Sequence, residues 1–219
     1  QQEKGVQILD VNVGLPEIDE VEMIKNAVFE LQSVIDLPLQ IDTVDIEAME
    51  QSMRLYNGKP LVNSVNGKKK NMKDVFPLIK KYGGTLIALT IDEDGIPETI
   101  EGRIKIAEKI IKTAKEYGID KKDIVVDPLA MTISSDTNSA NITLETVKRL
   151  SNMGIKTSLG VSNISFGLPN REFVTSTFFA MALQNGLNCA IMNPYSQEMM
   201  KVYYCSVSYT HLRAHETCA

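Results

Sequence analysis

The sequence is poor in the residues on which several classes of enzyme depend. Its 219 residues include no tryptophan and only two histidines, and both histidines fall within residues 205–219. Residues 1–204 therefore offer no Ser/His/Asp or Cys/His nucleophilic arrangement and no His/Cys zinc site. No lysine stands at the end of a predicted strand, which excludes a Schiff-base lysine at that edge.

Cysteines and long apolar runs are also scarce. The three cysteines, Cys189, Cys205 and Cys218, are odd in number and widely spaced, so they favour a reducing, cytoplasmic compartment over a disulfide framework. No apolar run approaches the roughly 18 residues of a membrane span. The opening "QQEKGVQ" lacks the apolar core of a signal peptide. We therefore expect no membrane partner.

Basic residues are fewer than acidic residues, with 23 Lys and Arg against 28 Asp and Glu. The formal net charge is −5 and the pI is about 5.2, whereas a nucleic-acid-binding face is basic. We therefore expect no nucleic-acid partner. The one basic run, Lys68–Lys70, is interpreted as a solvated loop or the start of a helix. No Gly-x-Gly-x-x-Gly fingerprint follows a predicted strand, which weakens a dinucleotide-binding interpretation.

What the sequence has is a regular alternation of strand and helix patterns. Between the strands, apolar residues recur at steps of three and four, which predicts amphipathic helices. A helix over 72–82 fits this scheme, with Pro77 expected only in a first turn. Short apolar runs, typical of strands covered on both faces, predict seven strands, at 7–13, 38–43, 60–65, 85–90, 124–129, 156–163 and 189–194.

Units of this kind, repeated at roughly 30-residue intervals, predict a parallel α/β sheet with right-handed crossovers. Two architectures compete, an open doubly wound sheet and a closed TIM (β/α)8 barrel. Seven strands are one short of the barrel. The opening "QQEKGVQILDV" looks like the tail of a helix that runs into a strand, so a first strand is expected upstream.

Residues 1–204 show no linker and are predicted to form one domain. The segment 205–219, "CSVSYTHLRAHETCA", breaks the pattern where the last helix should still be running. It resembles a translated sequencing adapter, and we interpret it as a non-native tail. A natural C-terminus is the alternative.

Polar side chains gather where the predicted strands end. In a parallel α/β sheet this edge binds ligands. Asp and Asn also start turns and cap helices. That explanation is preferred for Asp92, and for Asn193 the two explanations are equally good. The strand-end residues are Asp10, Asn12, Asp42, Asn63, Ser64, Thr90, Asp92, Asp127, Ser162, Asn163 and Asn193.

Four of them, Asp42, Asn63, Asp127 and Asn163, lie within or directly at the end of apolar runs. Polar groups placed there are costly without a ligand or water partner. Asp42 and Asp127 leave a carboxylate Mg²⁺ site open. A ring of carboxylates and amides is better suited to a flat heterocycle rich in N–H donors, because a carboxylate accepts two parallel N–H bonds.

Several motifs resemble a known family in order and spacing. They are "ILDVNVG", "IDT", "VNSVNG", "IVVDPL", "GVSNISFGLPNR" and "AIMNP". Together they resemble the pterin-binding domain of cobalamin-dependent methionine synthase, which is shared with corrinoid methyltransferases and related in fold to dihydropteroate synthase. The resemblance covers residues 5 to 201 and implies a TIM barrel that lacks its first strand, with its "GER-N"-like segment, and the end of its last helix.

The resemblance also implies roles for strand-end residues. Asp42, Asn63 and Asp127 would hold the pterin through its pyrimidine donors. Asp10 and Asn12 would line the floor of the same pocket.

Three further residues follow from the resemblance. Asn163 would face N5 of 5-methyltetrahydrofolate and act in catalysis, and Asn193 would contact the substrate. Arg171 would contact the pterin or the aminobenzoate portion, unless it is a surface residue at a helix start.

The implied reaction transfers the N5-methyl group of 5-methyltetrahydrofolate to cob(I)alamin during methionine synthesis. The cobalamin would be carried by another domain or protein. The nearest alternative is a stand-alone methyltetrahydrofolate:corrinoid protein methyltransferase, and a non-catalytic folate-binding module is a third. Dihydropteroate synthase fits less well, because no strand-end Lys/Arg and Arg-x-His pair is present.

Overall fold

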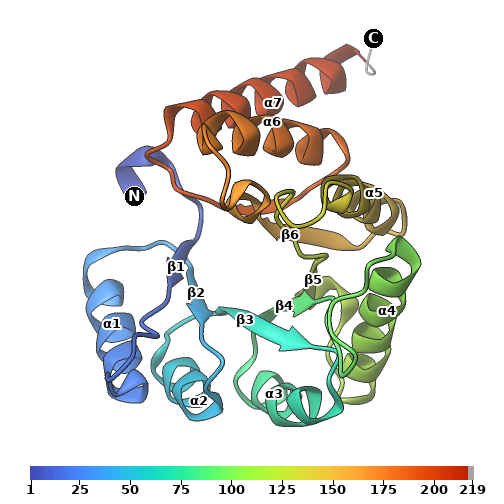
Figure 1. The fold of residues 1–219 in the computed structure, drawn as a ribbon. Helices are drawn as coiled ribbons and strands as arrows, with labels where there is room; N and C mark the ends of the chain where they lie inside the picture. The colour runs from blue at the N-terminus through green and yellow to red at the C-terminus, as the bar shows by residue number, and fades with distance from the viewer. Residues whose placement is uncertain (217–219) are drawn as a thin grey trace. The chain divides into compact units, whose positions relative to one another are not determined.

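The computed structural model describes residues 1–216 (Figure 1). The chain divides into two compact units, residues 1–127 and 128–219.

The first unit is built on a parallel sheet whose strands follow one another in chain order. The register pairs Asp10 with Gln40 and Asp42 with Asn63. It also pairs Leu89 with Asp127. All five strands therefore run toward the same edge. They are β1 (Leu9–Val11), β2 (Leu39–Asp42), β3 (Leu61–Asn66), β4 (Thr85–Leu89) and β5 (Ile124–Asp127).

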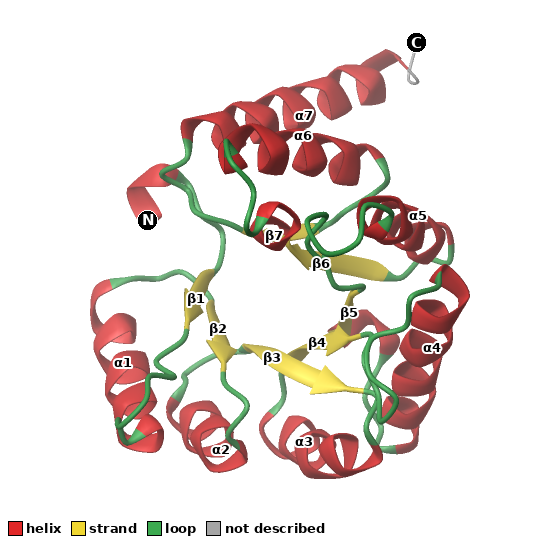
Figure 2. Ribbon diagram, in the orientation of Figure 1, coloured by secondary structure: helices red, strands yellow, loops and turns green. Residues whose placement is uncertain are grey.

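Four α-helices alternate with these strands, and Figure 2 shows α1, α2 and α3 on one face of the sheet. Three of them begin where a short polar side chain caps a free backbone N–H group: Asp19 caps α1, Asp45 caps α2 and Thr99 caps α4. The helices are α1 (Glu20–Val34), α2 (Ile46–Leu55), α3 (Lys69–Tyr82) and α4 (Ile100–Glu116), and two 3₁₀ turns, η1 (Gln2–Lys4) and η2 (Lys121–Asp123), complete the unit.

The two faces of the sheet differ in polarity. Leu39, Ile41 and Val62 are fully buried. Side chains alternate between the faces of a strand, so Gln40 and Asp42 point to the opposite face. The helix-covered face thus holds an apolar core, while the other face carries polar side chains along β2.

The second unit pairs two parallel strands, β6 (Lys156–Gly160) and β7 (Cys189–Ile191). Its core includes Leu159, Phe178 and Phe179, all nearly inaccessible to solvent. Helices α6 and α7 pack side by side (Figure 1). The other elements are α5 (Ser139–Asn152), the 3₁₀ turn η3 (Val161–Ser165), α6 (Arg171–Gln184) and α7 (Gln197–Glu216).

The structure confirms the positions of the seven predicted strands but shortens most of them, and one of these changes moves a predicted site residue out of the sheet. The run 156–163 leaves the sheet at Gly160, and Asn163 lies in η3 instead of in a strand. The backbone of Gly160 (φ −75°, ψ 79°) already departs from strand geometry. Asn163 is therefore placed by a turn.

The expectation for Pro77 is wrong, because this residue lies in the interior of α3, which begins at Lys69. Pro77 is exposed on the outer side of the helix. A carbonyl that loses its hydrogen bond there can bind water. The helix is held by its inner side, where Val75, Phe76 and Ile79 are buried. The Lys68–Lys70 run is the start of this helix.

The last helix, α7, begins at Gln197 and continues through residues 205–216. Residues 217–219 of the predicted non-native tail lie outside the described residues, so its origin stays a prediction. Within residues 1–216, no helix combines the length and apolarity that a membrane crossing requires.

Candidate functional site

Four polar side chains meet on the helix-free face of β1 and β2. The Gln40 amide donates to Oδ1 of Asp10 at 2.6 Å. The Asn12 amide donates to Oδ2 of Asp42 at 2.9 Å. Neither the Asp10 nor the Asp42 carboxylate accepts a further hydrogen bond from the described residues. Each carboxylate therefore keeps one oxygen available to an incoming N–H donor.

The strand register explains this grouping. Asp10 and Gln40 are direct partners, and Val11 pairs with Ile41, which brings Asn12 beside Asp42. The four side chains consequently form two layers, with Asn12 and Asp42 nearer the carboxyl edge. Asn12 is oriented from its other end, because its Oδ1 accepts the N–H of Gly14 at 3.1 Å. This bond turns its amide toward the carboxylate.

Asn63 and Asp127 belong to the same face. Asp42 pairs with Asn63 across β2 and β3, and Asn63 pairs with Ile87 of β4. Ile87 pairs in turn with Val125 of β5, and Asp127 follows Val125 by two residues, which returns it to that face. Asn63 is half-buried and Asp127 is buried. The unit thus places five predicted site residues on one face: Asp10, Asn12, Asp42, Asn63 and Asp127.

Asp10 and Asp42 lie in adjacent layers, and their proximity changes the pKa of Asp10. The pKa of Asp10 is raised, first because its carboxylate is partly desolvated and second because the charge of Asp42 is near. The hydrogen bond from Gln40 opposes the rise. A donor that enters this face would relieve the repulsion between the two carboxylates.

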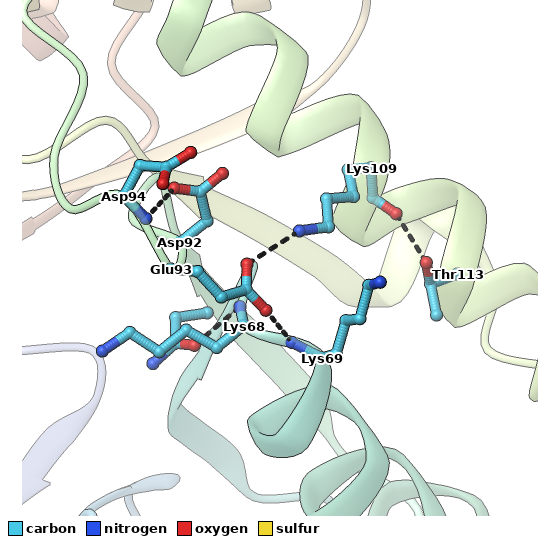
Figure 3. Close-up of polar contacts among 8 residues, drawn as sticks. Lys68, Lys69, Asp92, Glu93, Asp94, Lys109 and Thr113 are labelled. Carbon is cyan, nitrogen blue, oxygen red and sulfur yellow. Dashed lines mark hydrogen bonds and ion pairs between the residues drawn. The ribbon is translucent and has the colours of Figure 1, made fainter.

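Glu93, in the loop after β4, connects this loop to the segment that follows β3 (Figure 3). One carboxylate oxygen accepts the backbone N–H of Lys69 at 2.7 Å, and the other meets the ammonium of Lys109 at 3.3 Å. Because α3 has no capping side chain of its own, Glu93 caps it from the neighbouring loop. These bonds, led by the Lys69 N–H, lower the pKa of Glu93 to about 2.

We expect Glu93→Gln to lower the melting temperature at neutral pH. The folded-state pKa of Glu93 is depressed from 4.5 to about 2, so its stabilisation is present above pH 4.5 and is lost as the pH falls toward 2. The gap between wild type and variant should therefore narrow over that window in thermal unfolding measured by circular dichroism.

The matched control is Asp94→Asn in the same loop. Among the described residues the Asp94 carboxylate makes no hydrogen bond or ion pair, and only its backbone N–H is bonded, to Asp92. Its melting temperature should follow wild type. Equal melting temperatures for wild type and Glu93→Gln at neutral pH would contradict the role of Glu93 as a cap.

In the second unit, Asn163 is an exposed residue of η3. A Cβ atom at Gly160 would lie 3.2 Å from Nδ2 of Asn163. The Asn163 amide therefore packs close to the backbone of Gly160, and a larger residue at position 160 would crowd it. The turn therefore presents the Asn163 amide to solvent beside the end of β6.

Arg171 begins α6 and faces back toward η3. Its Nε donates to Oγ of Ser165 at 3.3 Å, and its Nη2 donates to the carbonyl of Ser162 at 3.1 Å. Asn193 follows β7, and its Oδ1 accepts the N–H of Tyr195 at 3.0 Å. Asn193 therefore forms a turn, one of the two explanations considered for it. Asp92 also forms a turn, since its Oδ1 accepts the N–H of Asp94 at 3.0 Å.

Sequence reasoning missed Gln40 and Glu93. Gln40 is buried at 4% exposure and bonds directly to Asp10. Its signal is present in "PLQIDT", where it precedes Asp42 by two residues and so shares its face. Within residues 1–216, no three or more His, Cys, Asp and Glu side chains are grouped as metal ligands.

A family model described as pterin binding enzyme matches residues 1–193. The chain belongs to this family. The methylcorrinoid:tetrahydrofolate methyltransferase of Eubacterium limosum is 32% identical over 212 residues, covering 94% of this chain and 78% of that protein. The methionine synthase of Mycobacterium leprae is 30% identical, but the chain spans only 17% of its length. The resemblance stated from the motifs is confirmed.

Solved structures of pterin-family proteins share the fold. A Yersinia pestis dihydropteroate synthase superposes with a TM-score of 0.78 at 13% identity, covering 96% of this chain and 85% of that chain. The enzyme from Clostridium difficile gives a TM-score of 0.76 at 20% identity, covering 95% and 84%. These matches confirm the TIM-barrel class, so the alternative of an open doubly wound sheet is wrong.

Proposed function

We propose that this pterin-binding chain holds a tetrahydrofolate and supports transfer of a methyl group between its N5 atom and a corrinoid. The observation that carries the proposal is the cluster of hydrogen-bond acceptors on one face of β1, β2, β3 and β5. The pyrimidine edge of a pterin presents N–H donors, and carboxylates accept such donors in parallel pairs. Asp42, Asn63 and Asp127 would bind this edge, above a floor formed by Asp10 and Asn12.

Asn163 would act at N5. Cleavage of the methyl–N5 bond leaves its electron pair on nitrogen, so N5 must gain a proton, which water can supply. An Asn amide donates to neutral N5 and, after rotation, accepts from N5–H⁺. Stabilisation that grows as N5 gains positive charge lowers the barrier more than it tightens ground-state binding.

The corrinoid would supply the nucleophilic cobalt, or the methyl group in the reverse direction, and would be carried by another domain or protein. The first unit presents apolar side chains near the carboxyl edge of its sheet. Val44, two residues after β2, is 90% exposed, and Leu15, in the loop after β1, is 63% exposed. We propose that the domain or protein that carries the corrinoid covers these side chains.

The relatives support two candidate activities, that of a stand-alone corrinoid methyltransferase and that of a methionine synthase module. The corrinoid methyltransferase of Eubacterium limosum matches over 78% of its own length, whereas the matched methionine synthases contain the chain as 17% of theirs. A role in methionine synthesis is the second candidate, and it shares the same site chemistry. A cytoplasmic location suits either activity.

Titration with 5-methyltetrahydrofolate followed by turnover with free cob(I)alamin tests the proposal. We expect saturable binding and formation of tetrahydrofolate and methylcobalamin, detected by the absorbance change of the corrinoid. Tetrahydropterin without the methyl group serves as the control for binding. Saturable binding without demethylation would contradict methyl transfer and leave a non-catalytic folate-binding module. An absence of binding would contradict the pterin site.

A further inference from the structure

No described residue forms a hydrogen bond with the Asn163 amide, so the backbone of the η3 turn sets where this side chain starts. The backbone carbonyl of Asn163 accepts the N–H of Phe166 at 3.1 Å. The orientation of the Asn163 side chain therefore depends on the contacts that fix the peptides before and after this residue. Those peptides belong to Ser162 and to the segment that ends at Ser165.

Ser165 is fully buried, and its hydroxyl is at the centre of this turn. It lies 3.2 Å from the carbonyl of Ser162 and 2.8 Å from Oγ1 of Thr175 in α6. It also accepts Nε of Arg171 at 3.3 Å. A hydroxyl has one proton to donate and two acceptor positions. When Ser165 donates to the carbonyl of Ser162 and accepts from Thr175 and Arg171, its one proton and both of its acceptor positions are used.

The carbonyl of Ser162 is held from two sides. It accepts from Ser165, and it also accepts Nη2 of Arg171 at 3.1 Å. The same guanidinium stacks over the ring of Phe166, 5.6 Å from its centroid. The Arg171 guanidinium thus contacts the turn both before Asn163, at Ser162, and after it, at Phe166.

We propose that Ser165 and Arg171 are positioning residues that fix the peptide preceding Asn163 and so orient its amide for N5. The inference rests on the proposed methyl transfer. Thr175 anchors Ser165 to the first turns of α6. Rigid placement matters here, because an amide that must donate to N5 and then accept from N5–H⁺ needs a constant distance to that atom through the reaction. Displacement by about 1 Å can cost on the order of 100-fold in rate.

The test is Ser165→Ala, studied in the wild-type and the Asn163→Ala backgrounds. We expect Ser165→Ala to lower kcat with free cob(I)alamin by roughly 10-fold or more, with the Kd for 5-methyltetrahydrofolate changed less than about twofold. In the Asn163→Ala background the same change should alter kcat by less than about twofold, because residues that act through one another are non-additive. Equal losses in both backgrounds would overturn the inference.

Arg171→Lys keeps the charge but removes the planar fork that reaches two acceptors. We expect a lower kcat with little change in Kd. A raised Kd with unchanged kcat would instead show that Arg171 contacts the substrate directly and would overturn its positioning role. Thr177→Val, on the exposed side of α6, is the matched control and should leave both quantities at wild-type values.

A second measurement is independent of turnover. The side-chain NH₂ signals of Asn163, identified as those that disappear in Asn163→Ala, are expected as one sharp pair in the wild-type NMR spectrum and in Thr177→Val. In Ser165→Ala they should shift or broaden. Unchanged signals would overturn the positioning inference even if the enzyme is active. A wild-type chain that binds folate without turnover would instead contradict the proposed function.

Discussion

Replacing Asn163 with alanine is expected to lower kcat for methyl transfer by about 100- to 1,000-fold, the usual loss when one hydrogen-bonding partner of a developing charge is removed. The Kd for 5-methyltetrahydrofolate should rise by about 10-fold at most, since a neutral hydrogen bond contributes about 0.5–1.5 kcal/mol. The asymmetry follows from chemistry: Asn163 meets a neutral N5 in the ground state and a protonated N5 near the transition state. Single-turnover kinetics and calorimetric titration measure the two effects separately.

Ser162→Ala is the control, because it lies next to Asn163 in η3 and loses only its exposed hydroxyl. The backbone carbonyl that Arg171 and Ser165 hold is retained, so kcat should stay near wild type. Asn163→Asp gives a second comparison, because the carboxylate can accept from N5–H⁺ but cannot donate to neutral N5. Equal losses in kcat and affinity for Asn163→Ala would make the residue a binding contact only.

The fold is largely predictable from the sequence because each strand is a short apolar run between turn formers. Runs such as "TLIALT" and "IVVDPL" leave no competing helical spacing, and the structure forms β4 and β5 there. The exceptions arise where tertiary packing overrides local preference. Pro77 remains in α3 because the opposite side of the helix is buried, and no local rule predicts that burial.

The candidate site is predictable to a smaller extent. Alternation along β1 and β2 and parallel register are enough to bring Asp10, Asn12 and Asp42 to one face. Contacts between distant loops are not readable in this way. Glu93 caps a helix that begins 24 residues earlier, and Ser165 meets a residue of the next helix. Such pairs depend on the three-dimensional approach of segments that carry no shared motif.

Asp127→Ala is expected to weaken binding of 5-methyltetrahydrofolate by at least about 100-fold. Asp127 ends β5 with 6% exposure, so a donor that reaches its carboxylate forms hydrogen bonds with little competition from water. Hydrogen bonds to a charged group contribute about 1.5–3 kcal/mol each, and a pterin edge can supply two. Each 1.4 kcal/mol corresponds to 10-fold in Kd. Isothermal titration of both proteins measures the difference.

Asp123→Asn provides the matched control at the other end of the same strand. Asp123 precedes β5 and pairs with Lys59 at 2.5 Å, on the edge opposite the carboxyl ends of the strands. The change removes one acidic group from the first unit, as Asp127→Ala does, but leaves the acceptors of the polar face in place, so the Kd should remain at the wild-type value. If both variants weaken binding equally, the effect comes from net charge. If Asp127→Ala binds within about threefold of wild type, the pterin is held elsewhere, because a buried carboxylate that contacts two donors cannot be lost without a large change in affinity.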